Sequence, residues 1–275
     1  MMAQLTVPTE WVQSFKQDPS KVGFLDLPRE LRDCVYSFAF HVQGAIFLLS
    51  MNPWAMDPGS IGQVVRHDNK GPVEPKRLRD VVPMTLLRTC GQIRSECSLV
   101  LFGDNIFRVW FLTTPDLAPC YRQLIRHITF DLQPDQKMYR PRWSGLEEVS
   151  YGWNRRWWPD VVSKSLRMLD QFPNVEDITI KLTSKDHGET WKPAFFDIEH
   201  KTREHRVAVA ARWMHPRCPI ENARLRNCLR LELQTPRVRE KDDYTNSRFA
   251  PDEEGESEWD FTEFADAFQL MKSFG

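Results

Sequence analysis

The chain has 275 residues, of which 41% are hydrophobic and 27% are charged, and this composition excludes an intrinsically disordered protein. Its 37 Lys and Arg are balanced by 38 Asp and Glu, so bulk positive charge does not hold it on nucleic acid or on an anionic membrane. Residues 1–21 lack the apolar run of a signal peptide and the 6 cysteines show no paired spacing, so we expect free thiols, no membrane association and a cytoplasmic or nuclear location.

The first predicted element is a helix that follows an N-terminal arm, residues 1–23. Pro28 suits the first turn of a helix, because its missing N–H would be unpaired there. Apolar residues then recur at spacings of four and three, which predicts one stripe facing the core: Leu27, Leu31, Val35, Phe38 and Val42. After Gly44 we expect a short buried strand at residues 45–51. Residues 52–83 are rich in Pro, Gly and charge, and we expect them to form a long loop.

The second predicted helix has the clearest periodicity in the chain, with apolar positions at Leu86, Cys90, Ile93, Cys97 and Leu101. Gly103 stands where a C-terminal glycine cap belongs, and alternating apolar residues from 107 to 111 predict a strand directly afterwards. We expect the two helices to pack on each other through one buried cluster made of Leu31, Val35, Phe38, Ile93, Cys97 and Leu101.

Three short runs of alternating apolar residues recur further along the chain. They begin at residues 128, 178 and 229, which lie 50 and 51 positions apart, and they contain Ile128, Phe130, Leu132; Ile178, Ile180, Leu182; and Leu229, Leu231, Leu233. Helical segments at 160–172 and 198–214 fill the gaps between them. This period predicts irregular leucine-rich-like units whose strands are parallel neighbours in one sheet. The loops that follow, at 133–158, 183–197 and 234–258, then leave from the sheet edge where ligands collect.

The C-terminal stretch is acidic, with 5 Lys and Arg against 11 Asp and Glu from residue 237 to 275, a net charge of −6. Phe261, Phe264, Phe268 and Met271 return at helical spacing, and we expect this helix to dock on the protein's own body, because exposed aromatics would form an adhesive patch. The predicted fold is α/β, or α+β. It comprises the arm, a helical and strand region at 24–115, βα units at 116–236, an acidic linker at 237–258 and an acidic aromatic helix at 259–275.

Two motifs in the N-terminal region resemble those of a known family. Leu27-Pro28-Arg29-Glu30-Leu31-Arg32, with Val35-Tyr36 shortly after it, resembles the opening motif of the fungal F-box-like proteins. The segment from Leu86 to Glu96, which contains Thr89-Cys90-Gly91-Gln92-Ile93, resembles their second motif. The resemblance covers residues 24–111 and implies F-box-like helices and a role in binding other proteins.

A true F-box recruits a ubiquitin-ligase adaptor through exposed apolar residues on its helices. The apolar stripe of the first helix fits that role, but it fits equally well a core face that packs on the second helix. The spacing of the residues leaves both interpretations open, and it favours the core face.

Recognisable catalytic apparatus is missing from the sequence. Cys120 and Arg126 have the spacing found in cysteine phosphatases, but the five residues between them contain no glycine to wrap backbone N–H groups around a phosphate. His200 and His205 are five positions apart and do not share a helix face, and no Cys-x2-Cys pair, Walker loop or nucleophile elbow is present. We therefore predict a protein without catalytic residues, metal or cofactor.

Arginine and tryptophan are interleaved between residues 139 and 158, a composition typical of protein hot spots and of nucleic-acid stacking platforms. Trp157 and Trp158, beside a predicted helix start, are expected to be buried. The candidate partner-binding residues are Arg140, Arg142, Trp143, Trp153, Arg155 and Arg156.

The function that the sequence favours is a non-enzymatic protein-interaction module whose partner contacts lie on the strand-end loops. Three different functions stay open beside it. They are a substrate receptor of a ubiquitin ligase, a nucleic-acid-binding protein that uses the Arg/Trp segment, and an enzyme without a recognisable motif.

Overall fold

The computed structural model describes residues 22–48, 62–68, 70–109, 117–132, 150–182, 202–233 and 262–274. In these residues one sheet of seven strands has the order β3-β2-β1-β4-β5-β6-β7. The strands are β1 (Ala45–Leu48), β2 (Gly62–Val65), β3 (Lys76–Arg77), β4 (Ile106–Val109), β5 (His127–Leu132), β6 (Asp177–Leu182) and β7 (Leu229–Leu233). From β1 to β7 the neighbours are parallel, whereas β2 is antiparallel to both β1 and β3, so the expected α/β class is confirmed.

The register of the parallel strands places Ile128 of β5 beside Ile178 of β6, and Ile178 beside Leu229 of β7. Phe107 of β4 continues the same row. All four side chains are buried and lie on one face of the sheet, because side chains alternate between faces with period two. The prediction that the three apolar runs are neighbouring parallel strands is therefore confirmed. Most residues of the loops that follow them lie outside the described part of the chain.

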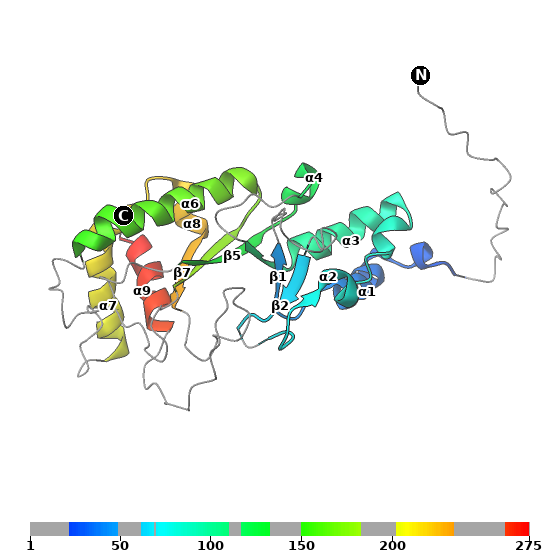
Figure 1. Cartoon of the computed structure of the whole chain (residues 1–275), viewed down its shortest axis with the longest axis horizontal. Helices are drawn as coiled ribbons and strands as arrows, with labels where there is room; N and C mark the ends of the chain where they lie inside the picture. Colours follow the sequence, from blue (N-terminus) through cyan, green and yellow to red (C-terminus); the bar gives the residue numbers. More distant parts are fainter. Residues whose placement is uncertain are drawn as a thin grey trace, which may run out of the picture.

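Helices connect the parallel strands. The longest is α6 (Trp158–Gln171), and α7 (Arg203–Met214) and α8 (Ala223–Cys228) precede β7. Figure 1 shows α6 and α8 along the same side of the sheet. Pro159 lies in the first turn of α6, and this helix buries Val161, Met168 and Leu169 in the core. The remaining described helices are η2 (Phe24–Asp26), α1 (Arg29–Phe40), α2 (Leu78–Val81), η3 (Leu86–Arg88), α3 (Gly91–Gly103), α4 (Pro119–Arg122), η5 (Trp153–Trp157), η7 (His215–Arg217) and α9 (Thr262–Lys272).

Helix α9 closes the β7 end of the sheet by packing on α7 and β7 (Figure 1). Phe264 and Phe268 are fully buried, and the Lys272 ammonium donates a hydrogen bond to the carbonyl of Leu229 at the start of β7 (2.9 Å). An open edge strand presents unpaired backbone groups, and a covering helix protects such an edge. For these residues the expectation that the aromatic helix docks on the body is confirmed, while Phe261 lies outside the described residues.

At the other end of the sheet α1 and α3 pack on each other, and Asn105 joins their ends. The buried side chain of Asn105 accepts a hydrogen bond from the N–H of Val42 (2.7 Å). It also donates to the carbonyls of Phe40 (2.8 Å) and Leu101 (3.0 Å). One amide thereby satisfies backbone groups that the C-terminal turns of two helices would otherwise leave unpaired.

The expected helix–helix cluster is only half right. Cys97 and Leu101 of α3 are buried and Ile93 packs against the core, as predicted. For α1 the prediction is wrong, because Leu31, Val35 and Phe38 are all exposed and the buried positions are Arg32, Tyr36 and Phe40. The exposed and the buried residues each follow helical spacing, and the buried ones come one or two positions later in the sequence. Apolar periodicity therefore predicted burial of the more hydrophobic of the two faces of α1, and the structure buries the other. The expected loop at 52–83 also contains β2, β3 and α2.

Two phenylalanines of α1 test this orientation. We expect Phe40→Ala to lower the free energy of unfolding by about 3–5 kcal/mol, because it leaves a cavity in the core. Phe38→Ala should change it by less than about 0.5 kcal/mol, because that ring lies in water. Urea denaturation of both variants measures the difference, and equal losses would contradict the orientation of α1.

Candidate functional site

A buried ion pair sets the rotation of α1 against α3. The Arg32 guanidinium binds both carboxylate oxygens of Glu96, with Nε–Oε2 at 3.0 Å and Nη2–Oε1 at 2.9 Å. Its third nitrogen donates to the carbonyls of Leu25 (3.1 Å) and Leu27 (2.6 Å), which join the segment before α1 to the same group. A bidentate pair of this kind fixes direction as well as distance, so Arg32 points inward and the opposite side of α1 points outward.

Two further groups complete the hydrogen bonding of Glu96. The Tyr36 hydroxyl donates to Oε2 (2.9 Å) and the Gln92 amide donates to Oε1 (3.1 Å). The hydrogen bonds from Arg32 are the main reason why the pKa of Glu96 falls to about 2, although burial opposes the shift. Burial raises the pKa of Tyr36, so its hydroxyl keeps the proton that it donates. The carboxylate is therefore ionised and fully bonded at neutral pH.

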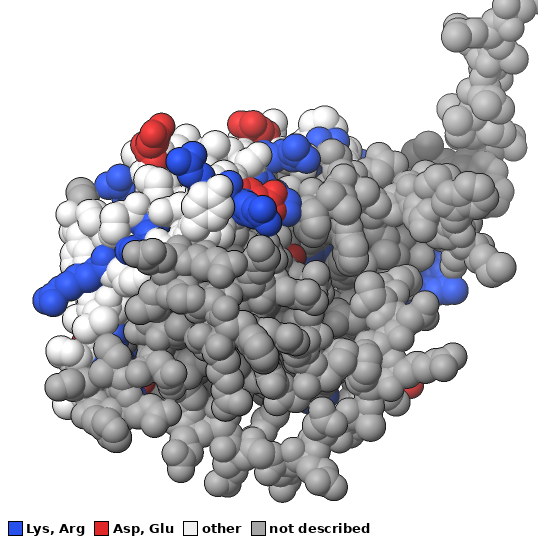
Figure 2. Space-filling model, turned by 60° about the vertical axis from the view of Figure 1, so that its left-hand side comes forward, with Lys and Arg blue, Asp and Glu red and all other residues white. Residues whose placement is uncertain are grey.

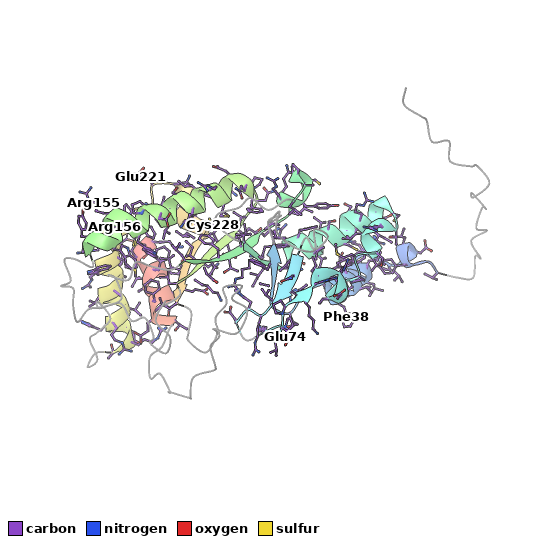
Figure 3. The ribbon with its side chains drawn as sticks, in the orientation of Figure 1. Phe38, Glu74, Arg155, Arg156, Glu221 and Cys228 are labelled. Carbon is purple, nitrogen blue, oxygen red and sulfur yellow. The ribbon has the colours of Figure 1, made fainter. Side chains whose placement is uncertain are left out.

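The outward side of α1 carries the candidate docking surface, which we call the α1 stripe: Leu31, Cys34, Val35 and Phe38. The exposed fractions are 52% for Leu31, 44% for Val35 and 94% for Phe38, and Cys34 is exposed between them. Figure 3 shows Phe38 projecting away from the sheet. Single exposed apolar residues are ordinary, but residues at positions i, i+4 and i+7 share one helix face and form a continuous apolar patch.

The second face of the parallel sheet carries a polar cluster. Arg108 of β4 pairs with Asp131 of β5, and Lys181 of β6 pairs with Asp68 from the segment after β2. Lys181 also lies 3.9 Å from Glu232 of β7. Each cation therefore faces a carboxylate. The Asp68–Lys181 pair connects the antiparallel strands β1 and β2 to the parallel strand β6. Burial lowers the pKa of the neighbouring His67 to about 4, so this imidazole is neutral at physiological pH. These ion pairs therefore join neighbouring strands to each other and join the segment after β2 to the sheet.

The predicted Arg/Trp site is divided by the structure. Arg140, Arg142 and Trp143 lie outside the described residues. Arg155 and Arg156 are exposed on the π-helical turn η5 (Figure 3). Trp157 and Trp158 are buried, which confirms the expectation for them.

Trp153 was a candidate partner-binding residue, with burial over the sheet as the open alternative. Its side chain is fully buried, so its place among the partner-binding residues is wrong. Its indole N–H donates to the sulfur of Cys218 (3.1 Å), and its ring packs on those of Trp157 (4.3 Å between centroids) and Trp213 (5.6 Å). Trp213 and Cys218 lie far along the chain, in and after α7, so the local composition gave no sign of them. The described tryptophans of the segment form a core instead of an open stacking platform.

The phosphatase-like spacing does not form a phosphate site. Cys120 is exposed on α4, whereas Arg126 lines a groove of about 380 Å³ between the turns that precede β5 and β6. There the Arg126 guanidinium lies 3.6 Å from the Glu176 carboxylate and is paired with it. The described residues contain no group of three His, Cys, Asp or Glu side chains placed to hold a metal ion, and within them no helix is long and apolar enough to cross a membrane. All six cysteines are free.

Comparisons of this chain with protein-family models, with curated proteins and with solved structures gave no match. The functional argument therefore starts from the surfaces described above, of which the α1 stripe has the most sharply defined geometry.

Removal of the Glu96 charge tests whether the ion pair sets this geometry. We expect Glu96→Gln to lower the free energy of unfolding by about 3 kcal/mol, because a buried guanidinium is left without its counter-ion. Glu74→Gln is the matched control, since Glu74 is exposed, and it should leave the stability unchanged (Figure 3). Urea denaturation gives both values, and a neutral effect of Glu96→Gln would contradict the role of the pair.

The same pair predicts an acid-dependent loss of stability. The pKa of Glu96 is about 2 in the folded protein and about 4.5 in the unfolded chain, so its contribution is complete above pH 4.5 and is lost as the pH falls toward 2. The gap in unfolding free energy between the parent and Glu96→Gln should therefore narrow across that range. Parallel urea titrations at several pH values measure the gap, and a constant gap would contradict the shifted pKa.

Proposed function

We propose that this protein is an interaction module that docks an amphipathic helix of a partner protein on the α1 stripe. The observation that carries the proposal is the exposure of Leu31, Val35 and Phe38 at helical spacing, on a helix whose rotation is fixed by a buried ion pair. A rigid apolar helix face is a common way for proteins to bind a partner helix, with anchors read at positions i, i+3, i+4 and i+7.

The size of the stripe fits this role. Complete burial of a Leu, Val or Phe side chain contributes roughly 1.5–3 kcal/mol, so three such residues supply a useful part of a binding free energy. Glu30 and Ser37, the neighbours of Cys34 one turn before and after it on the same side of α1, are exposed and give the apolar centre a polar margin. An apolar centre with a polar rim is the usual anatomy of a protein interface.

A ubiquitin-ligase adaptor is the partner that we propose as the second candidate. The resemblance of residues 27–36 and 86–96 to the fungal F-box-like motifs supports it, and the outward orientation of the α1 stripe favours it further. A core role for the same residues would require their burial, and they are exposed. Exposed apolar side chains on these helices are what adaptor binding requires.

Two further modes of binding receive less support. Binding through the strand-end loops involves residues that lie mostly outside the described part of the chain, and it stays a prediction. Nucleic-acid binding through the Arg/Trp segment is weakened by the burial of Trp153, Trp157 and Trp158.

A double variant of the stripe tests the proposal. We expect Val35→Asp with Phe38→Asp to abolish partner capture while the fold is kept, because both side chains are exposed and a carboxylate is costly to bury against the apolar face of a partner helix. Leu99→Asp, an exposed apolar residue of α3, is the matched control and should capture the same partners as the parent. Affinity capture with mass spectrometry compares the three proteins.

Two follow-up measurements separate the candidates. An environment-sensitive dye on Cys34, after replacement of the other exposed thiol Cys120 by serine, should report a drier environment when the captured partner is added. Purified ubiquitin-ligase adaptor should bind the parent and not the double variant if the second candidate is right. If the parent and the double variant capture the same partners, the proposal is wrong.

A further inference from the structure

Three helix ends meet at the end of the molecule furthest from α1. They are the segment Ser150–Trp157 at the start of α6, the last turn of α7 with η7, and the residues that follow α9 (Figure 1). The Arg217 side chain donates to the Ser150 hydroxyl (2.6 Å), the Trp213 ring packs edge-on against Trp153, and the ring of Phe274 lies edge-on to His215 (5.7 Å between centroids). These contacts join the three helix ends into one surface.

Two of the stretches that meet here carry charge of one sign. The stretches 150–157 and 212–218 contain Arg155, Arg156, Arg212 and Arg217 and no Asp or Glu. In Figure 2, where this end of the molecule is turned forward, Lys and Arg prevail over Asp and Glu on the described face. We call this surface the cationic end. Its composition contrasts with the whole chain, in which the two kinds of charge cancel.

Contacts inside the molecule hold one arginine of the cationic end in place. Arg217 is fixed by its bond to Ser150, by a second bond to the carbonyl of Trp213 (2.8 Å), and by stacking 4.4 Å over the Trp213 ring. Trp213 in turn rests on the buried ring of Trp153, in the same turn that presents Arg155 and Arg156. A side chain that is already ordered loses little entropy when a ligand binds, so rigid support of this kind favours binding.

Two exposed aromatic rings belong to the same surface. Tyr151 is 60% exposed and Phe274 is 42% exposed. Tyrosine, tryptophan and arginine are the residues most enriched at the energetic centres of protein interfaces. The arginines supply planar forks that match carboxylates, and the rings supply apolar contact area beside them.

We propose that the cationic end binds an acidic segment of a partner protein in which carboxylates alternate with apolar residues. Charge complementarity selects an anionic ligand, and the rings select a protein over a nucleic acid. A stacking platform for nucleic acid offers several open rings to successive bases. Here Arg217 covers one face of Trp213, Trp153 is buried and Phe274 contacts His215, so among the described rings of this surface Tyr151 is left with an open face. An acidic peptide can bind without open ring faces, because its carboxylates pair with the guanidinium groups and its apolar residues pack on the edges of the rings.

This surface is independent of the α1 stripe. Figure 3 places Arg155 and Arg156 at the left-hand end of the molecule and Phe38 at its lower edge, in the right-hand half. Two partners can therefore be bound at once, and loss of one binding activity leaves the other intact. The inference goes beyond the proposed docking on α1 and stands or falls separately.

The experiment uses the full chain and a fluorescein-labelled peptide of alternating Glu and Leu, with fluorescence anisotropy as the measurement. We expect the parent to bind the peptide with an affinity that falls as salt is raised, because the attraction is largely electrostatic. Arg155→Glu with Arg156→Glu should weaken binding by about tenfold or more, because two attractive charges become repulsive. Thermal unfolding should be unchanged, because both side chains are exposed.

The control has the same change in net charge at a distant place. Arg79→Glu with Arg88→Glu reverses two exposed arginines of the N-terminal region, and it should bind the peptide as the parent does. Equal weakening by both double variants would show attraction by bulk charge and would overturn the proposal. So would tighter binding of a fluorescein-labelled single-stranded DNA that is lost in Arg155→Glu with Arg156→Glu, since the surface would then serve nucleic acid.

Discussion

The buried pair of Arg32 and Glu96 is the interaction on which the N-terminal part of this protein depends. Removing two charges from water is costly, and the cost is offset here because Tyr36, Gln92 and two backbone carbonyls satisfy the remaining hydrogen bonds. An apolar contact would tolerate rotation of α1, whereas a bidentate ion pair does not. The pair therefore decides that the more hydrophobic side of the helix faces water.

The sheet obeys a simpler constraint. Phe107, Ile128, Ile178 and Leu229 form a buried row across four parallel strands, and their burial requires only that each strand alternates in the same phase. Long-range pairs then fix the borders of the sheet. Asp68 reaches Lys181 on the polar face, and the Lys272 ammonium of α9 reaches the first carbonyl of β7. The result is one continuous sheet between two ends with different surface chemistry.

The two ends carry the two surfaces for which we propose partners. At one end apolar side chains of α1 are exposed over a buried ion pair, and at the other end arginines are exposed over buried tryptophans. At each end a buried side chain supports the surface above it. Glu96 is the buried side chain under α1, and Trp153 is the buried side chain under Trp213. Glu96 orients α1 by binding Arg32. Trp153 packs on Trp213, and Arg217 stacks over the Trp213 ring.

The sequence alone determined the features that depend on local pattern. Alternation predicted β5, β6 and β7 with their common face, and the spacing of Phe264 and Phe268 predicted a docked helix. Both succeed because each element has one apolar face and that face must be buried. The tertiary structure decided the cases in which two faces compete or a partner is distant. Arg32 pairs with Glu96 across 64 residues, and Trp153 bonds to Cys218 across 65 residues. Periodicity within one helix carries no information about such partners, so only the assembled fold revealed which side of α1 faces the solvent and which tryptophan is buried.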